Sequence, residues 1–476
     1  MSELSIFPAS LSTARSFTTI LSKDNLKQYA RDCGALKRER KFSISDYILT
    51  ALTKMCKSTE KSEFTLCSVH DAYLRGCRKL RKAILTHKCI HKQLQSGNTL
   101  EVIKTMLSEL MTASFGKSFL KKIKKFISGD LKSLLDKLRV EDIILVDGTE
   151  IDLSYSCADN FDCKGRGRPH DDGTPPRPGL KLHIAFSVLR QSFVYVEITE
   201  AVGSERDSVL TDRFHNCLII CDRGYVDEEL EQRITDSGNL YLIRGKLSTA
   251  ATIDRAIGDD GKSIPEFKGK TVNKLPSKFC ADLDVTFASG HKNRIIVRYP
   301  PNCTDDDKRS ILRTNIPRDR LGAKQIYLLY RLRWAIELFK KANKRSNCLK
   351  SINSANENII LSFILLSLTV SIIKTYTGLK CAKDNSFEWI SMLKLHKQNE
   401  CFEGLFKALL FRKSSTVYQI FKELLDDIAL LCQRSEPSNR DIVKLKDLPT
   451  LVWQIVNHPD PSAKNAKGLG DDFNMK

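Results

Sequence analysis

The sequence has no charge-free run long enough to cross a bilayer. The nearest candidate, residues 359–373, carries no charge, but it is shorter than the ~20 residues that a transmembrane helix needs, and serines and a threonine interrupt it. We therefore expect a buried helix packed on a catalytic sheet. No signal peptide is evident, and the 15 cysteines are scattered and odd in number. Both features favour an intracellular, reducing compartment over a disulfide-bonded secreted protein.

Acidic residues are fewer than basic residues in this chain. The chain of 476 residues has 57 Asp and Glu against 77 Lys and Arg, which gives a formal net charge of +20. An excess of this size favours a polyanionic partner, either nucleic acid or an acidic membrane surface. Because the basic residues recur along the whole chain, an extended DNA-binding track is favoured over a single basic tail.

Two apolar runs each lead into an aspartate beside a glycine. Residues 142–149 contain Asp147, and residues 217–225 contain Asp222. Continuous apolar runs of this length are typical of strands covered on both faces. We therefore predict two strands that end in a carboxylate. A single aspartate near a glycine is also a common turn, so the pair carries more weight than either one alone.

A third carboxylate, Glu337, lies on a predicted amphipathic helix that begins near residue 324. At about 100° per residue, Tyr330, Arg333, Glu337 and Lys344 fall within one stripe about 60° wide, and apolar residues occupy the opposite side. One carboxylate flanked by cations and a phenol suits a metal ion held against a phosphate backbone. The alternative is an ordinary solvated face.

Three carboxylates are the minimum that can hold two hard divalent ions through oxygen. Two such ions about 3.5–4 Å apart clamp the attacking and leaving oxygens of an in-line phosphoryl displacement. Asp147, Asp222 and Glu337 are therefore the candidate metal-binding and catalytic residues. Capping or paired acids at strand ends are the alternative.

Tyr330, Arg333, Glu337 and Lys344 match the Y-(2)-R-(3)-E-(6)-K signature gap for gap. In this the chain resembles bacterial DDE transposases of the insertion-sequence-four type, over roughly residues 30–380. The resemblance implies an RNase H-like catalytic core interrupted by a β-rich insertion. It also implies Mg²⁺, with Mn²⁺ able to substitute, at the three acids. Arg333, Lys344 and Tyr330 would then contact phosphates near the cut.

Further DNA contacts are predicted outside the three acids. A Gly- and Pro-rich loop over residues 154–180 carries Lys164, Arg166 and Arg168, which suit a phosphate-contacting arm. Trp334 borders the polar stripe, where it could stack on an unpaired base, although packing is the stronger interpretation. Residues 86–94 could form a recognition helix, with Thr86 as N-cap, or belong to a generic helical bundle.

The predicted fold class is α/β: an RNase H-like mixed sheet flanked by helices, with an α-helical N-terminal domain. The expected parts are a helical DNA-binding domain (1–135), the first part of the core (136–245), a β-rich insertion (246–317), the second part of the core (318–390) and a helical C-terminal region with a tail (391–476). Strands 182–189 and 193–199 are expected to form an antiparallel hairpin, followed by a helix over 226–235 and a strand over 240–243.

The function that these features favour is DNA transposition. The protein would bind the inverted ends of a mobile element, cleave them with two metal ions and join the 3′-hydroxyls to target DNA. The expected partners are double-stranded DNA and a second copy of the chain in the DNA complex, in a bacterial cytoplasm, with no membrane. The alternatives are an RNase H-like nuclease without strand transfer and a DNA-binding protein that has lost catalysis.

Overall fold

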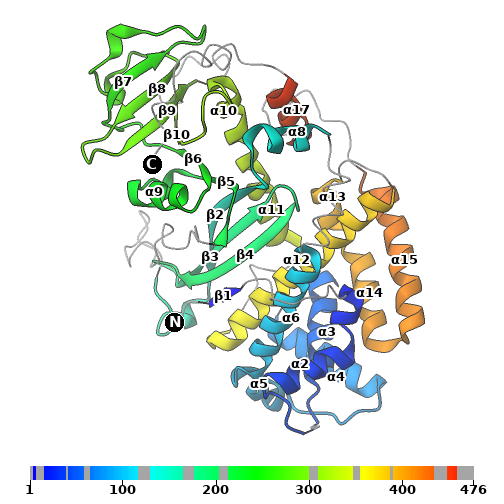
Figure 1. Ribbon diagram of the computed structural model, residues 1–476. Helices are drawn as coiled ribbons and strands as arrows, with labels where there is room; N and C mark the ends of the chain where they lie inside the picture. Colours follow the sequence, from blue (N-terminus) through cyan, green and yellow to red (C-terminus); the bar gives the residue numbers. More distant parts are fainter. Residues whose placement is uncertain are drawn as a thin grey trace.

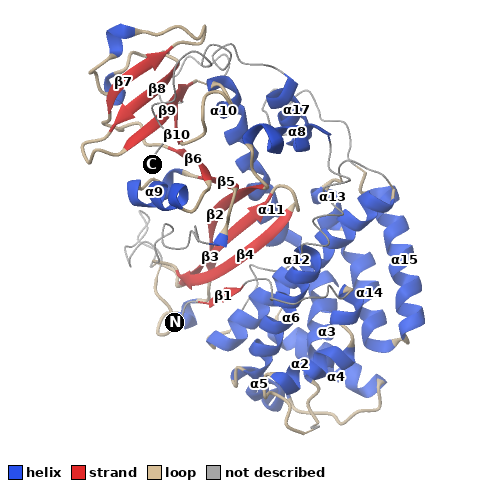
Figure 2. Ribbon diagram, viewed as in Figure 1, coloured by secondary structure: helices blue, strands red, loops and turns tan. Residues whose placement is uncertain are grey.

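Figure 1 shows the computed structural model of the protein. It describes residues 4–6, 16–38, 41–57, 65–115, 129–163, 176–202, 213–299, 309–346, 354–385, 390–433 and 448–457. Strands gather in one part of the molecule and a bundle of helices forms the other, as the colours of Figure 2 make plain.

The strands form one 10-stranded mixed sheet with the order β1-β4-β3-β2-β5-β6-β10-β9-β8-β7. Their bounds are β1 (Leu4–Ile6), β2 (Asp142–Asp152), β3 (Gly179–Ser187), β4 (Ser192–Glu200), β5 (Cys217–Cys221), β6 (Leu240–Arg244), β7 (Thr252–Ile257), β8 (Ala281–Thr286), β9 (Lys292–Arg298) and β10 (Ser310–Thr314).

The pairing of the strands changes from antiparallel to parallel at β2. Strand β3 pairs antiparallel with both β2 and β4, whereas β5 pairs parallel with β2, and β6 pairs parallel with β5. Parallel neighbours need a crossover connection, which α9 (Glu228–Asp236) provides, capped by the Asp227 side chain. The predicted hairpin, helix and following strand are confirmed.

Strands β7 to β10, which we call the β extension, continue the central sheet. Strand β10 pairs antiparallel with β6, so the predicted β-rich segment adds to the same sheet and does not form a separate one. Its apolar side chains form a core of their own, in which Ile253, Leu283 and Ile295 pack with Phe267 and Val272 of two short 3₁₀ turns, Pro265–Phe267 and Val272–Lys274.

The two faces of the central strands belong to different cores. On one face, Val146 of β2 and Cys221 of β5 pack with Ile234 of α9. On the other face, Leu145 and Ile220 join the main core, which extends into the helices. The predicted burial of these strands on both faces is confirmed, because β5 is buried along its whole length.

Both ends of the chain contribute to one helical bundle (Figure 1). Helix α3 packs against α14, α4 packs against α3, and α6 packs against α2. The members are α1 (Phe17–Ile20), α2 (Lys23–Asp32), α3 (Ile44–Lys57), α4 (Leu66–Lys79), α5 (His87–Gln95), α6 (Asn98–Phe115), α13 (Met392–Lys397), α14 (Asn399–Phe411) and α15 (Ser414–Leu431). Helices α8 (Gly129–Leu138) and α17 (Leu448–Asn457) pack against each other beside the sheet.

The charge-free run lies in α12 (Glu357–Asp384), a helix of 28 residues. By length and composition it could cross a membrane, but 94% of its most apolar window is buried inside the protein. The prediction of a buried helix is confirmed. Its main neighbours are α6, α15 and α3, and only a smaller contact reaches β4. The expectation that this helix packs on the sheet is therefore only partly met, through its small contact with β4.

The helix that carries the Y-R-E-K residues is interrupted. Helix α10 (Ala323–Tyr330) ends at a 3₁₀ turn, η8 (Arg331–Arg333), before α11 (Trp334–Ser346) begins. The prediction of one continuous α-helix was therefore wrong. A 3₁₀ turn advances about 120° per residue instead of about 100°, so three residues add about 60° of rotation. By this count Glu337 moves from about 20° on one side of Tyr330 to about 40° on the other, so the two residues still share one side of the segment.

Candidate active site

Asp147 and Asp222 come from neighbouring parallel strands. The register of β2 and β5 pairs Val146 with Cys221, so the two aspartates are the next residues on each strand. Because adjacent strands lie about 4.8 Å apart, the backbone brings the two carboxylates to one place. Strand β2 continues to Asp152 beside β3, whereas β5 ends. The prediction that Asp147 ends its own strand was wrong; it lies where the neighbouring strand stops.

Both aspartates face the helices that follow the β extension. Side chains alternate between the faces of a strand, and Val146 and Cys221 point toward α9. Asp147 therefore points to the opposite face, and Asp222 does so too because its backbone is still extended. Helix α11 contacts β2 on the sheet, and it brings Glu337 in its first turn to this face.

Two cations of the helical segment contact Asp147. The Lys340 ammonium donates a hydrogen bond to Asp147 Oδ2 and another, of 3.1 Å, to the carbonyl of Gly148. The Arg333 guanidinium lies 3.6 Å from the same Asp147 oxygen. Its other terminal nitrogen donates to Glu337 Oε1 at 2.5 Å. Arg333 therefore joins the strand carboxylate to the helix carboxylate.

Asp222 has a different partner. The Tyr330 hydroxyl donates to Asp222 Oδ1 at 3.0 Å. Burial raises the pKa of Asp222, but the backbone N–H of Arg223, the charge of Arg333 and the Tyr330 hydroxyl together hold this pKa below its usual value of 3.8. Asp222 is thus a carboxylate at neutral pH, which is the form that a metal ion needs.

Arg333 and Tyr330 are held in their usual protonation states. Burial alone lowers the pKa of Arg333, but Tyr330, Asp222, Glu337 and Asp147 raise it above its ordinary value. Burial also raises the pKa of Tyr330. The guanidinium stays charged and the phenol stays a hydrogen-bond donor, with the Arg333 carbon 5.9 Å from the centre of the Tyr330 ring.

Solvent reaches the site from the side of Glu337. The side chain of Glu337 is 30% exposed, whereas those of Asp147 and Arg333 are 14% and 16% exposed. Among these three side chains, Glu337 is therefore the most accessible to a ligand from solvent.

Some predicted DNA contacts lie outside the described residues. This holds for Lys164, Arg166 and Arg168 in the loop after β2. The backbone of Lys344 belongs to α11, but its side chain lies outside what the structure describes. Trp334 is the first residue of α11 and is half-buried. These predictions remain predictions.

Sequence reasoning missed two basic residues of the site. Lys340 follows Glu337 by three residues on α11, which places both on one side of the helix; this spacing could have identified it. Arg244 ends β6, and the register that pairs Cys221 with Ile243 sets Arg244 beside Asp222. The charge of Arg244 contributes to the lowered pKa of Asp222.

The donor set fits hard divalent cations, which prefer carboxylate oxygens. In the described part of the chain, however, the oxygens of Asp147, Asp222 and Glu337 do not gather into a cluster within 4.8 Å. Each carboxylate bonds a cation or a phenol instead. A metal ion that binds Asp147 Oδ2 would therefore compete with the ammonium of Lys340.

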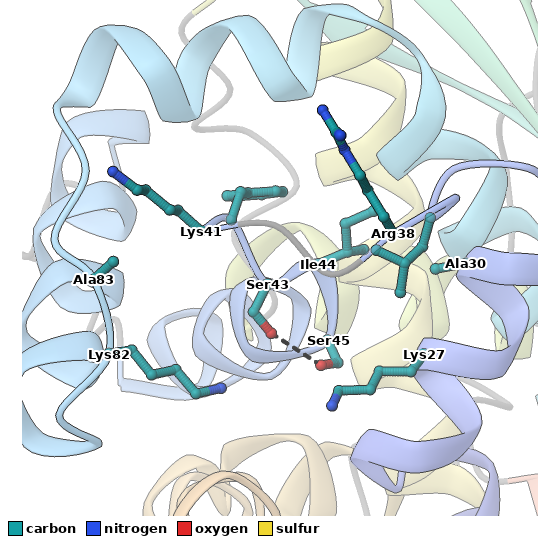
Figure 3. A pocket seen from close by; sticks show the side chains of 11 residues that line it. Lys27, Ala30, Arg38, Lys41, Ser43, Ile44, Ser45, Lys82 and Ala83 are labelled. Carbon is teal, nitrogen blue, oxygen red and sulfur yellow. Dashed lines mark hydrogen bonds between the residues drawn. The ribbon is translucent and has the colours of Figure 1, made fainter.

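A separate basic pocket lies in the helical bundle, at the start of α3. It has a volume of about 780 Å³, and its lining includes the cationic side chains Lys27, Arg38, Lys41 and Lys82. Figure 3 shows Lys27 and Lys82 approaching Ser43 and Ser45 from opposite sides of the pocket. The buried carboxylate of Asp46 pairs with Lys82. The remaining positive charge suits a phosphate group.

With this geometry described, comparisons with known proteins bear on its chemistry. Residues 138–368 match the family model of the transposase DDE domain. The matched DDE domain begins just before β2 and ends within α12, so it contains Asp147, Asp222 and Glu337 together with Lys340. It also includes the β extension.

Among solved structures, the chain is similar to one described as the cryo-EM structure of piggyBac transposase synaptic complex with hairpin DNA. The identity is 10% and the TM-score is 0.41, with 89% of this chain and 86% of that chain covered. No curated protein matches the chain.

Proposed function

We propose that the protein is a DNA transposase of the insertion-sequence-four type, built on an RNase H-like core. It binds the inverted ends of a mobile element, cleaves them and joins the freed 3′-hydroxyls to target DNA. The observation that carries this proposal is the placement of Asp147 and Asp222 side by side on parallel strands, under the helix that brings Glu337.

The strand order supports the RNase H-like part of the proposal. Three antiparallel strands, β4, β3 and β2, are followed by the parallel strands β5 and β6. Asp147 lies on β2, the first strand of the core along the chain, and Asp222 directly follows β5, the strand that pairs parallel with β2. The match of residues 138–368 to the transposase DDE domain supports the same assignment.

In the proposed reaction, water adds to the phosphorus at the element end, the bond to the 3′-oxygen breaks, and this oxygen takes up a proton. The freed 3′-hydroxyl then loses its proton and attacks the phosphorus of a target phosphodiester, the bond from that phosphorus to the target's 3′-oxygen breaks, and this oxygen takes up a proton. Mg²⁺ ions, for which Mn²⁺ can substitute, would supply the positive charge that the attacking and leaving oxygens need. Asp147, Asp222 and Glu337 would hold these ions.

The cations of the site have a role on the DNA side. Arg333 can turn from Glu337 toward a phosphate and bind it through two N–H groups, because a guanidinium presents a planar fork. Lys340, once displaced from Asp147, offers a point charge to the same strand. Tyr330 keeps its proton and can donate to Asp222 or to a phosphate oxygen. Lys344 and Trp334 remain proposed DNA contacts on α11.

Further DNA contacts are proposed for the basic pocket at the start of α3 and for Lys164, Arg166 and Arg168. The net charge of +20 supports many phosphate contacts. We further propose that two copies of the chain act together on paired element ends, in the cytoplasm of a bacterium and on its nucleoid when bound to DNA.

The test uses the purified full chain, a labelled DNA duplex made from the sequences that flank its gene, and a supercoiled target plasmid. With Mg²⁺ we expect nicked and cleaved ends first, and labelled plasmid later. Cleaved ends without labelled plasmid would indicate a nuclease. Binding without cleavage would indicate a DNA-binding protein that has lost catalysis, and either result overturns the proposal.

A further inference from the structure

A pocket rich in sulfur and imidazole groups lies at the N-terminal ends of α4 and α5, far along the chain from the three acids. It has a volume of about 460 Å³, and four of its lining residues are Cys67, His70, His87 and His91. Cys67 and His70 are three residues apart on α4, and His87 and His91 are four apart on α5. Each pair therefore lies on one face of its helix.

Among the described residues, the ligand atoms of Cys67, Asp71 and His87 all lie within 4.8 Å of one another, which suits one metal ion. His70 and His91 lie outside this set, so their rings would turn toward Cys67 on metal binding. Cys67 Sγ and His87 Nδ1 are 3.7 Å apart. For a tetrahedral zinc ion, with Zn–S of about 2.3 Å and Zn–N of about 2.05 Å, two such ligand atoms are separated by about 3.5 Å. The ring of His70 lies 5.4 Å from that of His87 and 6.3 Å from that of His91, measured between centres.

His70 gives an independent indication of a missing partner. The residue is only 3% exposed, and its Nε2 is buried without a hydrogen-bond partner. A buried polar atom left unpaired destabilises the folded state, so such atoms normally have a partner.

Asp71 completes the arrangement from outside. Its Oδ1 lies 2.9 Å from His87 Nε2, the ring nitrogen that does not face Cys67. Histidines that bind zinc commonly donate their second N–H to a carboxylate, which fixes the ring and its tautomer. Asp71 thus directs Nδ1 of His87 toward Cys67.

We propose that Cys67, His70, His87 and His91 bind one structural zinc ion, with Asp71 orienting His87. The spacing is Cys-x₂-His, a connection of 16 residues, and His-x₃-His. One thiolate and three imidazoles are ligands that zinc prefers over Mg²⁺. The ion fastens the start of α5 to α4. It thereby fixes the position of α5, whose exposed lysines, Lys88 and Lys92, face solvent.

The test measures metal content of the purified full chain by mass spectrometry, with excess Mg²⁺ present to occupy the acidic site. We expect about one zinc per chain. Replacement by Co²⁺ should give a thiolate-to-cobalt absorption band and the intense visible bands of tetrahedral coordination. Cys67→Ser and His91→Gln should each reduce zinc to near zero and remove the thiolate band or weaken the visible bands.

Two variants make the result specific. Cys89→Ser removes another exposed cysteine of α5 that does not line the pocket, and it should retain zinc fully. Asp71→Asn should keep zinc with roughly 10–100-fold weaker affinity, as for other partners of zinc-binding histidines. Because Cys67 is exposed, Cys67→Ser should fold, which circular dichroism checks.

The proposal fails if the parental chain, grown and purified with zinc, contains none and gives no thiolate-to-cobalt band. It also fails if Cys67→Ser keeps both zinc and that band. Neither result depends on DNA cleavage, so the zinc site and the proposed transposase activity stand or fall separately.

Discussion

The candidate active site and the β extension each contain acidic side chains paired with cations, and the two clusters differ in burial. At the candidate active site, Asp147 and Glu337 keep 14% and 30% of their side-chain surface exposed. In the β extension, Asp282 is 2% exposed and accepts two hydrogen bonds from Arg294, at 3.0 and 2.6 Å, and one from Arg318 at 2.9 Å.

The difference separates exchangeable contacts from structural ones. Arg294 also donates to the carbonyls of Ile316 and Leu321, so the buried arginine ties β9 to the segment that leads into α10. Both oxygens of Asp282 and all three nitrogens of the Arg294 guanidinium bond to other groups of the protein. At the active site, by contrast, Arg333 and Lys340 hold carboxylates that a metal ion or a phosphate can take from them. Charge pairs are thus needed for the fold in one place and for chemistry in the other.

The largest expected effect is loss of cleavage when an active-site acid is neutralised. Asp147→Asn, Asp222→Asn and Glu337→Gln should each bring Mg²⁺-dependent cleavage of an element end to background, because each removes a charged metal ligand. Thermal unfolding and end binding should stay near parental values. Parental cleavage by any one of these variants removes that residue from the metal site.

The matching change in the β extension should affect folding instead. Asp282→Asn leaves Arg294 and Arg318 buried beside a neutral group, which should lower the free energy of unfolding by about 3–5 kcal/mol. Urea denaturation followed by circular dichroism measures this. If Asp282→Asn unfolds at the parental urea concentration while Asp147→Asn does not, the distinction drawn here is reversed.

A smaller effect is expected at Arg333. Arg333→Ala removes a charge-assisted contact worth about 1.5–3 kcal/mol, so cleavage or end binding should fall roughly ten- to a hundred-fold. Arg333→Lys should recover only part of this, because an ammonium cannot replace a planar fork. A time course of nicked and cleaved ends compares the two variants. If Arg333→Lys loses as much cleavage as Arg333→Ala, the contact needs the two N–H groups of the guanidinium. If Arg333→Lys cleaves at the parental rate, a two-point contact is excluded.

Lys340 offers a test of the idea that its ion pair is exchangeable. Removing an ammonium that competes for Asp147 should strengthen Mn²⁺ binding to the DNA-free protein by up to about fivefold, since partly exposed ion pairs are worth about 1 kcal/mol or less. Titration calorimetry on Lys340→Met measures this, and Lys341→Met, which changes an exposed neighbour, is the matched control. Weaker Mn²⁺ binding by Lys340→Met would show that Lys340 supports the site.

The smallest effect concerns pH. Burial raises the pKa values of Asp222 and Asp282, but both are lowered overall in the folded chain. At Asp282 the nearby cations outweigh the effect of burial, and at Asp222 hydrogen bonds and cations do so together. Each carboxylate therefore contributes stability that is present above pH 3.8 and is lost as the pH falls through the lowered value. The free energy of unfolding should therefore fall less steeply below pH 3.8 in Asp282→Asn than in Asp222→Asn. Urea titrations at several pH values measure this.

Local patterns in the sequence predicted much of the site. Apolar runs identified β2 and β5, and helical spacing placed Arg333 near Glu337. The 3₁₀ turn at Arg331–Arg333 was missed because the residues there do not differ in composition from the helices beside it. Lys340 was missed because its partner, Asp147, is distant in sequence and approaches only when α11 packs on β2.

Contacts between elements that are distant in sequence could not be predicted, because local sequence patterns do not identify the partner. Nothing in β10 alone indicates that it pairs with β6, and nothing in α3 indicates that it packs on α14. His87 and His91 fall within residues 86–94, for which the sequence suggested a recognition helix. Cys67 and His70 lie on the preceding helix, and only the packing of α4 against α5 brings the four side chains to one pocket.

The contact of α3 with α14 has a consequence for synthesis of the chain. Roughly 340 residues separate the end of α3 from the start of α14, and ribosomes add about 5–20 residues per second. The apolar face of α3 that α14 covers therefore waits on the order of 20–70 s for its partner. Until translation has nearly finished, the first helices cannot complete their bundle, and a prematurely terminated chain carries an unfinished N-terminal region.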